Sequence, residues 1–298
     1  MWFGVSIGIV SAVMQSASYI FSRRFVTTYH SSVKLVIYSQ LWMGLFGAIV
    51  FAATVPFTMF PHSWKFAAVL AVFVIAYNVA FYCFFRAVNE IESSRLSSLL
   101  GLKVAVIALI MLLLHGTQLR LPHYAAVVMT AVSAVGMNFS GVRISRRGAL
   151  FLALTLLGFS TTDITGTMFV KMMPGGAATR SAICVTSLSY VILGIISSAA
   201  LLRMRFERAT LRGALPYSAL WFSAMLLLFA SFGIVGVVFG SIIQASRGLI
   251  SVLFGVLLAR TGFVGADPDV PRRIWIRRAV MALIMIGAIG LYSWSSAQ

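Results

Sequence analysis

Two basic residues stand in the middle of long apolar stretches of this sequence. Lys103 lies within residues 94–114, and Arg247 lies within residues 237–259. If these stretches cross a bilayer as helices, each charge lies about 15 Å from either water layer, at about 1.5 Å of rise per residue. Placing a charge there costs about 3 kcal/mol or more. We therefore expect both side chains to face a cavity or a partner instead of lipid.

The neighbours of Arg247 favour a binding site for an anion. Gln244, Arg247 and Ser251 are spaced to share one face of a helix. A guanidinium can hold a carboxylate or a phosphate through two hydrogen bonds, and a structural ion pair with an acid is the alternative. Lys103 has only apolar neighbours on its own stretch. Its partner must therefore come from another helix or from a substrate.

Asp163 is the one acid that the sequence places well inside an apolar stretch. Two roles are open: a carboxylate that takes up and releases a proton, or the counter-ion of Lys103 or Arg247. We favour the counter-ion. In that case one basic residue still lacks an acid within the membrane. A single net positive charge is then left for an anionic or carboxylate-bearing ligand.

Four further polar side chains are candidates for the same site: Gln15, Tyr19, Asn78 and Tyr82. Polar side chains also join membrane helices by hydrogen bonds, so each of the four has this structural role as its alternative. The histidines and cysteines show no metal-ligand spacing, and no ATP-binding loop is present. We therefore expect no metal, no cofactor and no catalytic residue.

The composition indicates a helical membrane protein as the frame for these residues. Of the 298 residues, 60% are hydrophobic and only 10% are charged, against about 25% charged in soluble domains. A spanning helix needs about 20 apolar residues. Ten stretches qualify: 2–22, 33–55, 65–86, 94–114, 122–139, 148–170, 181–202, 215–234, 237–259 and 275–295. The predicted fold is therefore all-α, with ten transmembrane helices.

The distribution of positive charge predicts how these helices are oriented. The net charge of +17 lies in short links between apolar stretches, which is a topology signal and not a nucleic-acid-binding surface. Odd-numbered links hold 17 of the 23 Lys and Arg residues, and even-numbered links hold 4. Positively charged links stay in the cytoplasm. We therefore expect a multi-pass protein of the plasma (bacterial inner) membrane with both termini outside the cytoplasm.

A weak internal repeat divides the chain into two halves. Residues 11–26 align with residues 155–170 at an offset of 144, and the two membrane-embedded basic residues are separated by the same offset. This predicts one repeat over residues 1–141 and a second over residues 147–298. Because each repeat has five spans, the second is inverted relative to the first. Inverted repeats with a site near the midplane are typical of secondary transporters.

Ten spans, a five-plus-five repeat and about 300 residues resemble the EamA-type members of the drug/metabolite transporter superfamily. The resemblance implies a secondary transporter that works without ATP. A narrower similarity concerns the sugar-phosphate and nucleotide-sugar transporters of this superfamily, which bind phosphate through basic residues in the fourth and ninth spans. Lys103 and Arg247 fall in those two spans.

Three functions remain open on these grounds. The first is alternating-access transport of a small anionic or zwitterionic metabolite at a midplane site lined by Lys103 and Arg247. The second is proton-coupled export of amino acids or of cationic, aromatic compounds, with Asp163 titrating. The third is a lipid flippase or an integral-membrane enzyme, although the sequence lacks the paired acids or histidine cluster of such an enzyme. The oligomeric state is not predicted.

Overall fold

The computed structural model describes residues 1–54, 63–88, 90–91, 96, 99–115, 120–138, 144–173, 177–248, 250, 254 and 272–297. Within these ranges every regular element is a helix, which confirms the all-α prediction. The elements in chain order are α1 (Trp2–Tyr29), α2 (Ser32–Thr54), α3 (Trp64–Val88), the 3-10 helix η2 (Leu100–Leu102), α5 (Lys103–His115), α6 (Leu121–Asn138), α7 (Arg146–Met172), α8 (Ala178–Leu201), α9 (Arg208–Val235), α10 (Val237–Ala245) and α12 (Arg272–Ala297).

Six of these helices are long and apolar enough to cross a membrane: α1, α2, α3, α7, α8 and α9. The described parts of the remaining helices are not among these six, so the count of ten spans stays a prediction. Some boundaries differ from those expected. Helix α9 begins at Arg208 instead of residue 215 and contains Pro216, and α1 runs past Arg23 and Arg24 to Tyr29. Long arginine side chains reach water from a helix that continues beyond the apolar layer, so these charges did not mark the helix ends.

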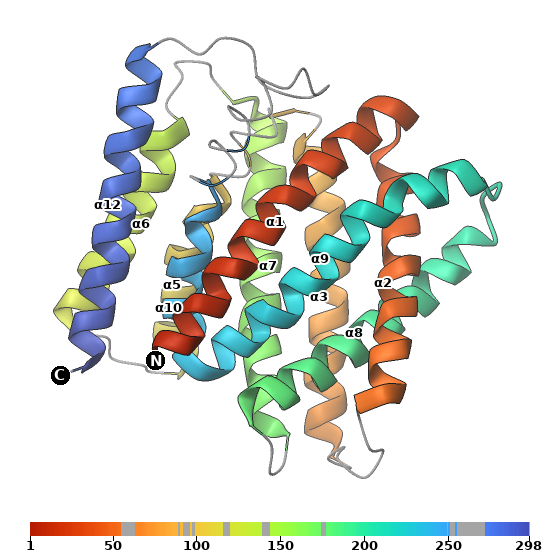
Figure 1. Cartoon of the computed structure of the whole chain (residues 1–298), viewed down its shortest axis with the longest axis horizontal. Helices are drawn as coiled ribbons and strands as arrows, with labels where there is room; N and C mark the ends of the chain where they lie inside the picture. Colours follow the sequence, from red (N-terminus) through yellow and green to blue (C-terminus); the bar gives the residue numbers. More distant parts are fainter. Residues whose placement is uncertain are drawn as a thin grey trace.

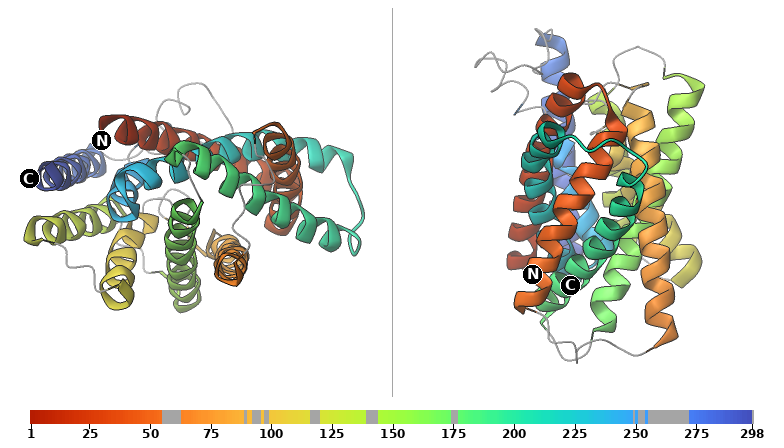
Figure 2. Two further views of the ribbon diagram at one scale, coloured as in Figure 1. Left: turned by 90° about the horizontal axis from the view of Figure 1, so that it is seen from below. Right: turned by 90° about the vertical axis from the view of Figure 1, so that its right-hand side faces the viewer.

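The helices form a bundle with two rows. Seen from one end, α6, α5, α7 and α3 form one row, and α12, α1 and α9 lie opposite, with α10 between α5 and α1 (Figure 2). The most extensive helix pairs are α1 with α9, α2 with α8, α3 with α7, and α6 with α12. Both chain ends lie toward the same end of the bundle (Figure 1).

Small residues bring several of these pairs into backbone contact. A Cβ atom added to Gly44 of α2 would lie 2.7 Å from the Cα atom of Gly194 of α8. A Cβ atom added to Gly158 of α7 would lie 2.7 Å from the Cβ atom of Ala80 of α3. Such close crossings are the usual means by which membrane helices associate. The crossing at Gly158 holds α7, which carries Asp163, tightly against α3.

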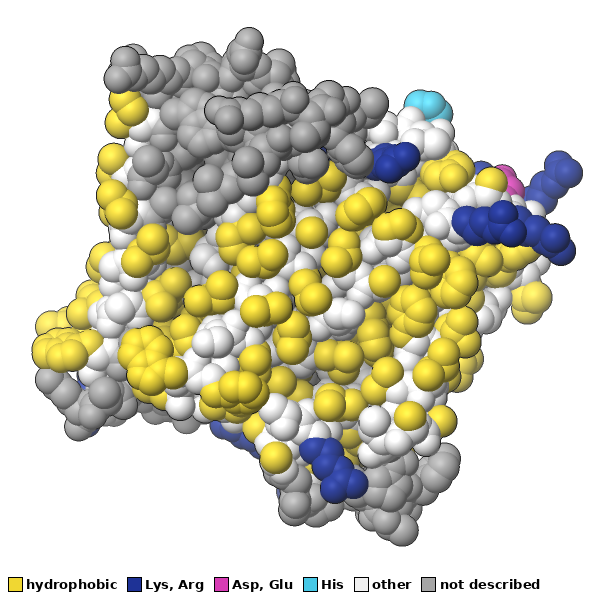
Figure 3. Space-filling model, viewed as in Figure 1, with side chains coloured by type: hydrophobic (Ala, Val, Ile, Leu, Met, Phe, Trp, Pro, Cys, Tyr) yellow, Lys and Arg dark blue, Asp and Glu magenta, His cyan; other side chains and the backbone are white. Residues whose placement is uncertain are grey.

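The outer surface of the bundle is apolar across its middle. Apolar side chains cover this band, while the visible Lys and Arg side chains gather toward its edges (Figure 3). On α3, for example, Val72, Ile75 and Val79 are 45%, 63% and 48% exposed and share one helix face. A surface of this kind suits the acyl chains of a bilayer, and with the apolar helices it supports an integral membrane protein.

Candidate functional site

Lys103 and Arg247 both lie where a helix departs from regular α-geometry. Residues Leu100–Leu102 form a 3-10 turn, and Lys103 is the first residue of α5. Helix α10 ends at Ala245, and Arg247 follows directly after the turn residue Ser246. Apolar periodicity predicted uninterrupted α-helices through both positions and did not reveal these irregularities. Interruptions of this kind inside a membrane span often form the binding sites of transporters.

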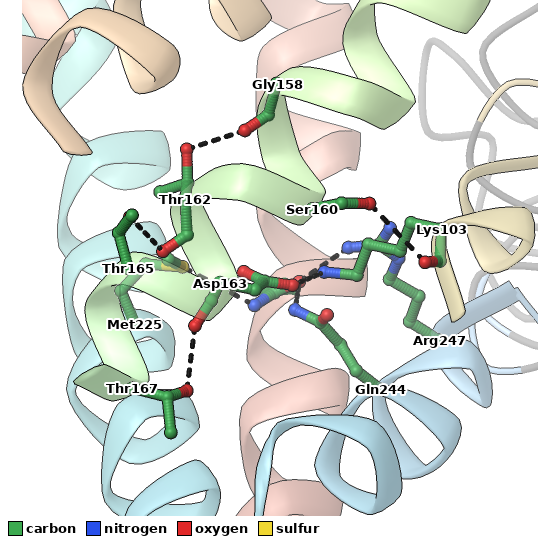
Figure 4. A network of polar contacts seen from close by, with 11 residues as sticks. Lys103, Gly158, Ser160, Thr162, Asp163, Thr165, Thr167, Met225, Gln244 and Arg247 are labelled. Atoms are coloured by element: carbon green, nitrogen blue, oxygen red, sulfur yellow. Dashed lines mark hydrogen bonds and ion pairs between the residues drawn. The ribbon is translucent and has the colours of Figure 1, made fainter. Parts of the chain in front are cut away.

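Both basic side chains are buried, and one of them has an acidic partner. Lys103, Asp163 and Arg247 are each only 3% exposed. The Nζ atom of Lys103 donates a hydrogen bond to Oδ2 of Asp163 at 2.5 Å, which joins α5 to α7 (Figure 4). Ser160 strengthens this junction, because its hydroxyl donates to the Lys103 carbonyl at 3.4 Å. Asp163 is therefore the counter-ion of Lys103 in this conformation.

Arg247 is held by neutral groups. Its Nη1 atom donates to Oε1 of Gln15 on α1 at 2.9 Å, and Nε2 of Gln244 donates to the same oxygen at 2.9 Å. The Ser16 hydroxyl donates to the Arg247 carbonyl at 3.0 Å. The Nε atom of Arg247 is buried and has no hydrogen-bond partner among the described residues. One donor of the guanidinium is therefore left without an acceptor.

Lys103, Asp163, Arg247, Gln15 and Gln244 form what we name the charged cluster. Two bases and one acid give it a net charge of +1, and Arg247 interacts electrostatically with both members of the ion pair. Electrostatic interactions are stronger in a buried environment than in water. The arrangement can therefore bind a single carboxylate or phosphate charge at Arg247.

Hydroxyl side chains along α7 are bonded within their own helix. Thr162 donates to the Gly158 carbonyl at 2.9 Å, Thr165 donates to the Thr162 carbonyl at 3.2 Å, and Thr167 donates to the Asp163 carbonyl at 2.8 Å (Figure 4). Thr165 also donates to the Thr161 carbonyl at 2.7 Å. Such bonds satisfy the hydroxyl groups and bend helices slightly. These threonines therefore shape α7 around Asp163 and leave their donors unavailable to a ligand.

A second group, which we name the aromatic cluster, consists of Tyr19, Tyr77, Tyr190, Tyr217 and Trp221. The indole Nε1 of Trp221 donates to the hydroxyl of Tyr77 at 3.1 Å and to that of Tyr190 at 3.0 Å. The ring centroids of Tyr19 and Tyr217 lie 5.9 and 5.8 Å from that of Trp221. Tyr19 also interacts electrostatically with Arg247. Tyr19 therefore connects the aromatic cluster to the charged cluster.

Sequence reasoning missed most of the aromatic cluster. Of its members only Tyr19 was predicted, and Trp221 is 4% exposed in the interior. One signal was present: Trp221 follows Tyr77 by 144 residues, the same offset that separates Lys103 from Arg247. A pair of aromatic residues at the repeat offset, one of which carries a hydroxyl, could have been singled out on that ground.

Two other predicted residues, Asn78 and Tyr82, are not brought into the charged cluster. Asn78 donates to the Val74 carbonyl at 2.9 Å and accepts from Nε2 of Gln40 at 3.5 Å, so it joins α3 to α2. Tyr82 is 56% exposed, and the Arg86 guanidinium carbon lies 5.8 Å from its ring centroid. Ser251 lies outside the described residues. Across the described part of the chain, no group of three His, Cys, Asp or Glu residues could hold a metal ion.

Apolar helices that enclose a desolvated ionic cluster define a membrane protein with a polar interior. Residues 2–139 match the EamA-like transporter family. The matched segment is 138 of the 298 residues, and it agrees with the predicted resemblance to EamA-type members of the drug/metabolite transporter superfamily.

Similarity to individual proteins concerns the fold only. One solved structure, described as "Crystal structure of protein", has a TM-score of 0.65 to this chain at 15% sequence identity. The similarity covers 98% of this chain and 96% of that one. No curated protein matches the sequence.

Proposed function

We propose that this chain is a secondary transporter that moves a small anionic or zwitterionic metabolite by alternating access. The anionic group binds Arg247 in the charged cluster. One observation carries the proposal: Arg247 is 3% exposed and bonded to the neutral Gln15, while Asp163 already neutralises Lys103. An uncompensated buried charge destabilises a protein by several kcal/mol, roughly 3–5 when a buried pair is broken. A carboxylate or phosphate ligand offsets that cost.

The charge of the cluster also suggests how transport is driven. Empty, the cluster carries +1; with a monovalent anion bound it is neutral. Moving a neutral site through a closed, desolvated state costs less than moving a charged one. The loaded transporter therefore changes conformation more readily than the empty one. This favours two modes of transport. One anion is exchanged for another, or an anion moves down its own concentration gradient.

The helix pairing supports the two inverted repeats that alternating access requires. An offset near 144 residues relates α1 to α7 and α3 to α9, so the α1–α9 pair corresponds to the α7–α3 pair. The α2–α8 and α6–α12 pairs each join corresponding helices of the two halves. The proposed repeats cover residues 1–141 and 147–298. The charged cluster takes residues from both, as a midplane site between repeats would.

A second candidate function is favoured by the aromatic cluster. Proton-coupled export of aromatic or cationic compounds would use Asp163 as the titrating group and the rings around Trp221 as the binding surface. Cations are attracted to the faces of aromatic rings. In that mechanism protonation of Asp163 would leave both bases uncompensated, so we rank it below anion transport.

Transport by reconstituted protein tests the leading proposal. A thermal-shift panel of monocarboxylates, amino acids, sugar phosphates and nucleotides identifies a binding anion, and its labelled form is then followed into proteoliposomes. Arg247→Gln should abolish uptake, while Arg203→Gln, which changes an exposed arginine in a turn, should leave it unchanged. Uptake by Arg247→Gln at the wild-type rate would refute the proposal.

The proposed membrane orientation has a separate test. We place the protein in the plasma (bacterial inner) membrane, with the arginine-rich links in the cytoplasm and both termini outside. A periplasm-dependent reporter fused after Gln298 should be active, and the same reporter placed after Met204 should be inactive. The reverse pattern would contradict the charge distribution.

A further inference from the structure

The aromatic cluster contains hydroxyl protons in excess of the hydrogen bonds that they make among the described residues. The hydroxyl oxygens of Tyr77 and Tyr190 are 2.9 Å apart, and both accept from the indole N–H of Trp221. One of these hydroxyls donates to the other. The proton of the second hydroxyl then has no acceptor among the described residues.

Two more hydroxyl groups add to this excess. The hydroxyls of Tyr19 and Tyr217 are buried and have no hydrogen-bond partner among the described residues. The rings of Tyr19 and Tyr217 lie 5.9 and 5.8 Å from that of Trp221, whose indole N–H donates to Tyr77 and Tyr190, so all four tyrosines gather around one residue. Three donors therefore lack an acceptor within one small region.

This excess is unusual for a protein interior. Tyr77, Tyr190 and Tyr217 are each 1% exposed. Leaving one buried donor unsatisfied costs about 1–3 kcal/mol, and most buried polar groups find a partner. Three such groups together indicate that an acceptor belongs here which the chain itself does not supply. An acceptor atom of a ligand meets this need, and so does an ordered water.

The surroundings decide between a ligand and a structural water. The ring centroids of Phe81 and Tyr19 lie 5.4 and 5.9 Å from that of Trp221, so the donors are set among apolar ring surfaces. A water, which needs two to four polar partners, fits these hydroxyls as well. Aromatic walls around a few donors are typical of small-molecule sites and favour a ligand. Tyr19 lies one helical turn from Gln15, which accepts a hydrogen bond from Arg247.

The position of the cluster also fits a transport site. Tyr77 comes from α3 in the first half of the chain, and Tyr190, Tyr217 and Trp221 come from α8 and α9 in the second half. A ligand bound there would contact both halves. Its binding would therefore be sensitive to their relative movement.

We propose that the aromatic cluster is a second subsite of the transport site, which binds a neutral oxygen acceptor carried on an apolar, ring-like body. The inference rests on the proposed function for the anionic end of the ligand, where a carboxylate or phosphate binds Arg247. The substrate is then an amphipathic anion with a carbonyl or ether oxygen away from its charged group. Tyr217 and the Tyr77–Tyr190 pair donate to that oxygen, and the Trp221 ring packs against the body.

Matched probes on the purified full-length protein test this subsite. Benzamide carries a neutral acceptor, toluene carries none, benzoate carries the charge alone, and 4-carbamoylbenzoate carries both. Binding is followed by tryptophan fluorescence, with Trp221→Phe identifying the responding residue. Tyr217→Phe keeps the ring and removes one donor, and Tyr77→Phe does the same at a second position.

The expected pattern separates the subsite from the charged cluster. Tyr217→Phe should weaken benzamide and 4-carbamoylbenzoate about 5- to 10-fold, the effect of one hydrogen bond, and leave toluene and benzoate unchanged. Arg247→Gln should weaken benzoate and spare benzamide. If Tyr217→Phe and Tyr77→Phe, both monodisperse in size-exclusion chromatography, bind benzamide as the wild type does, the donors hold water and the subsite is refuted. If Tyr217→Phe weakens the binding of benzamide while Arg247→Gln leaves the binding of benzoate unchanged, the subsite is supported and the proposed anion transport is refuted.

Discussion

The charged cluster is fully buried and the aromatic cluster is buried except for the part-exposed Tyr19, and the two are incomplete in different ways. The charged cluster has one positive charge more than it has acids, because Asp163 neutralises only Lys103. The aromatic cluster is uncharged, yet the hydroxyls of Tyr19 and Tyr217 have no hydrogen-bond partner among the described residues. In both clusters buried donors make no hydrogen bond among the described residues: the Nε atom of Arg247 in one and tyrosine hydroxyls in the other. A ligand that supplies one anionic and one neutral oxygen would complete both.

Helix α1 is the structural link between the two clusters. Gln15 binds Arg247, and Tyr19 packs on Trp221. These two residues are four apart and lie on the same face of α1. Movement of α1 would therefore change both clusters together, and substitutions in either cluster can separate their contributions.

The largest expected effect comes from breaking the buried ion pair. Asp163→Asn leaves Lys103 charged and unpaired in the interior, and the loss of one partner of a buried pair costs about 3–5 kcal/mol. We expect a strongly lowered unfolding temperature for the purified protein. The double substitution Lys103→Met with Asp163→Leu removes both charges and should recover most of the loss. A single Asp163→Asn variant as stable as wild type would show that the pair is not desolvated.

A smaller effect distinguishes an unsatisfied hydroxyl from a satisfied one. Tyr217→Phe removes a hydroxyl without a partner among the described residues, so the empty protein should keep its stability or gain up to about 1 kcal/mol. The matched control is Tyr38→Phe, since the Tyr38 hydroxyl accepts from the Glu207 N–H at 2.9 Å. It should lose about 1 kcal/mol. Equal losses in the two variants, measured by chemical unfolding, would mean that Tyr217 has a partner in the empty state.

The smallest effect contrasts the buried pair with an exposed one. Lys34 and Thr210 donate hydrogen bonds to the Glu207 carboxylate, and these bonds hold its pKa below the usual range. A lowered pKa in the folded state means that this contribution to stability is present above the unfolded pKa and is lost as the pH falls through the folded one. Stability measured from pH 6 to pH 3 should therefore fall slightly less in Glu207→Gln than in wild type. Identical profiles would show that the exposed pair adds nothing.

The sequence predicted the charged cluster better than the aromatic one for a physical reason. A charge within an apolar stretch is costly, so Lys103, Asp163 and Arg247 stand out without any structure. The sequence did not predict which of these charges form a pair. Lys103 and Asp163 are 60 residues apart, and apolar periodicity does not indicate which helices are in contact. The neutral hydroxyls of Tyr190 and Tyr217 give no such signal, since buried tyrosines are common in apolar helices.

The same limit explains the residues that lie elsewhere. Polarity alone predicted Asn78 and Tyr82 as site residues, but the faces of α3 direct Asn78 toward Gln40 of α2 and leave Tyr82 exposed. The helical class and most helix bounds followed from apolar length. The 3-10 turn before Lys103 did not, because its residues Leu100–Leu102 include two leucines and continue the apolar pattern.

The central claim is that Arg247 supplies the one uncompensated charge that selects an anion. The most direct measurement is the ratio of affinities for the transported anion and for its uncharged amide, in wild type, Arg247→Gln and the control Arg203→Gln. We predict that Arg247→Gln lowers this ratio about 10- to 100-fold, as expected for loss of a charge-assisted hydrogen bond, and that Arg203→Gln leaves it unchanged. An unchanged ratio in Arg247→Gln would contradict the claim.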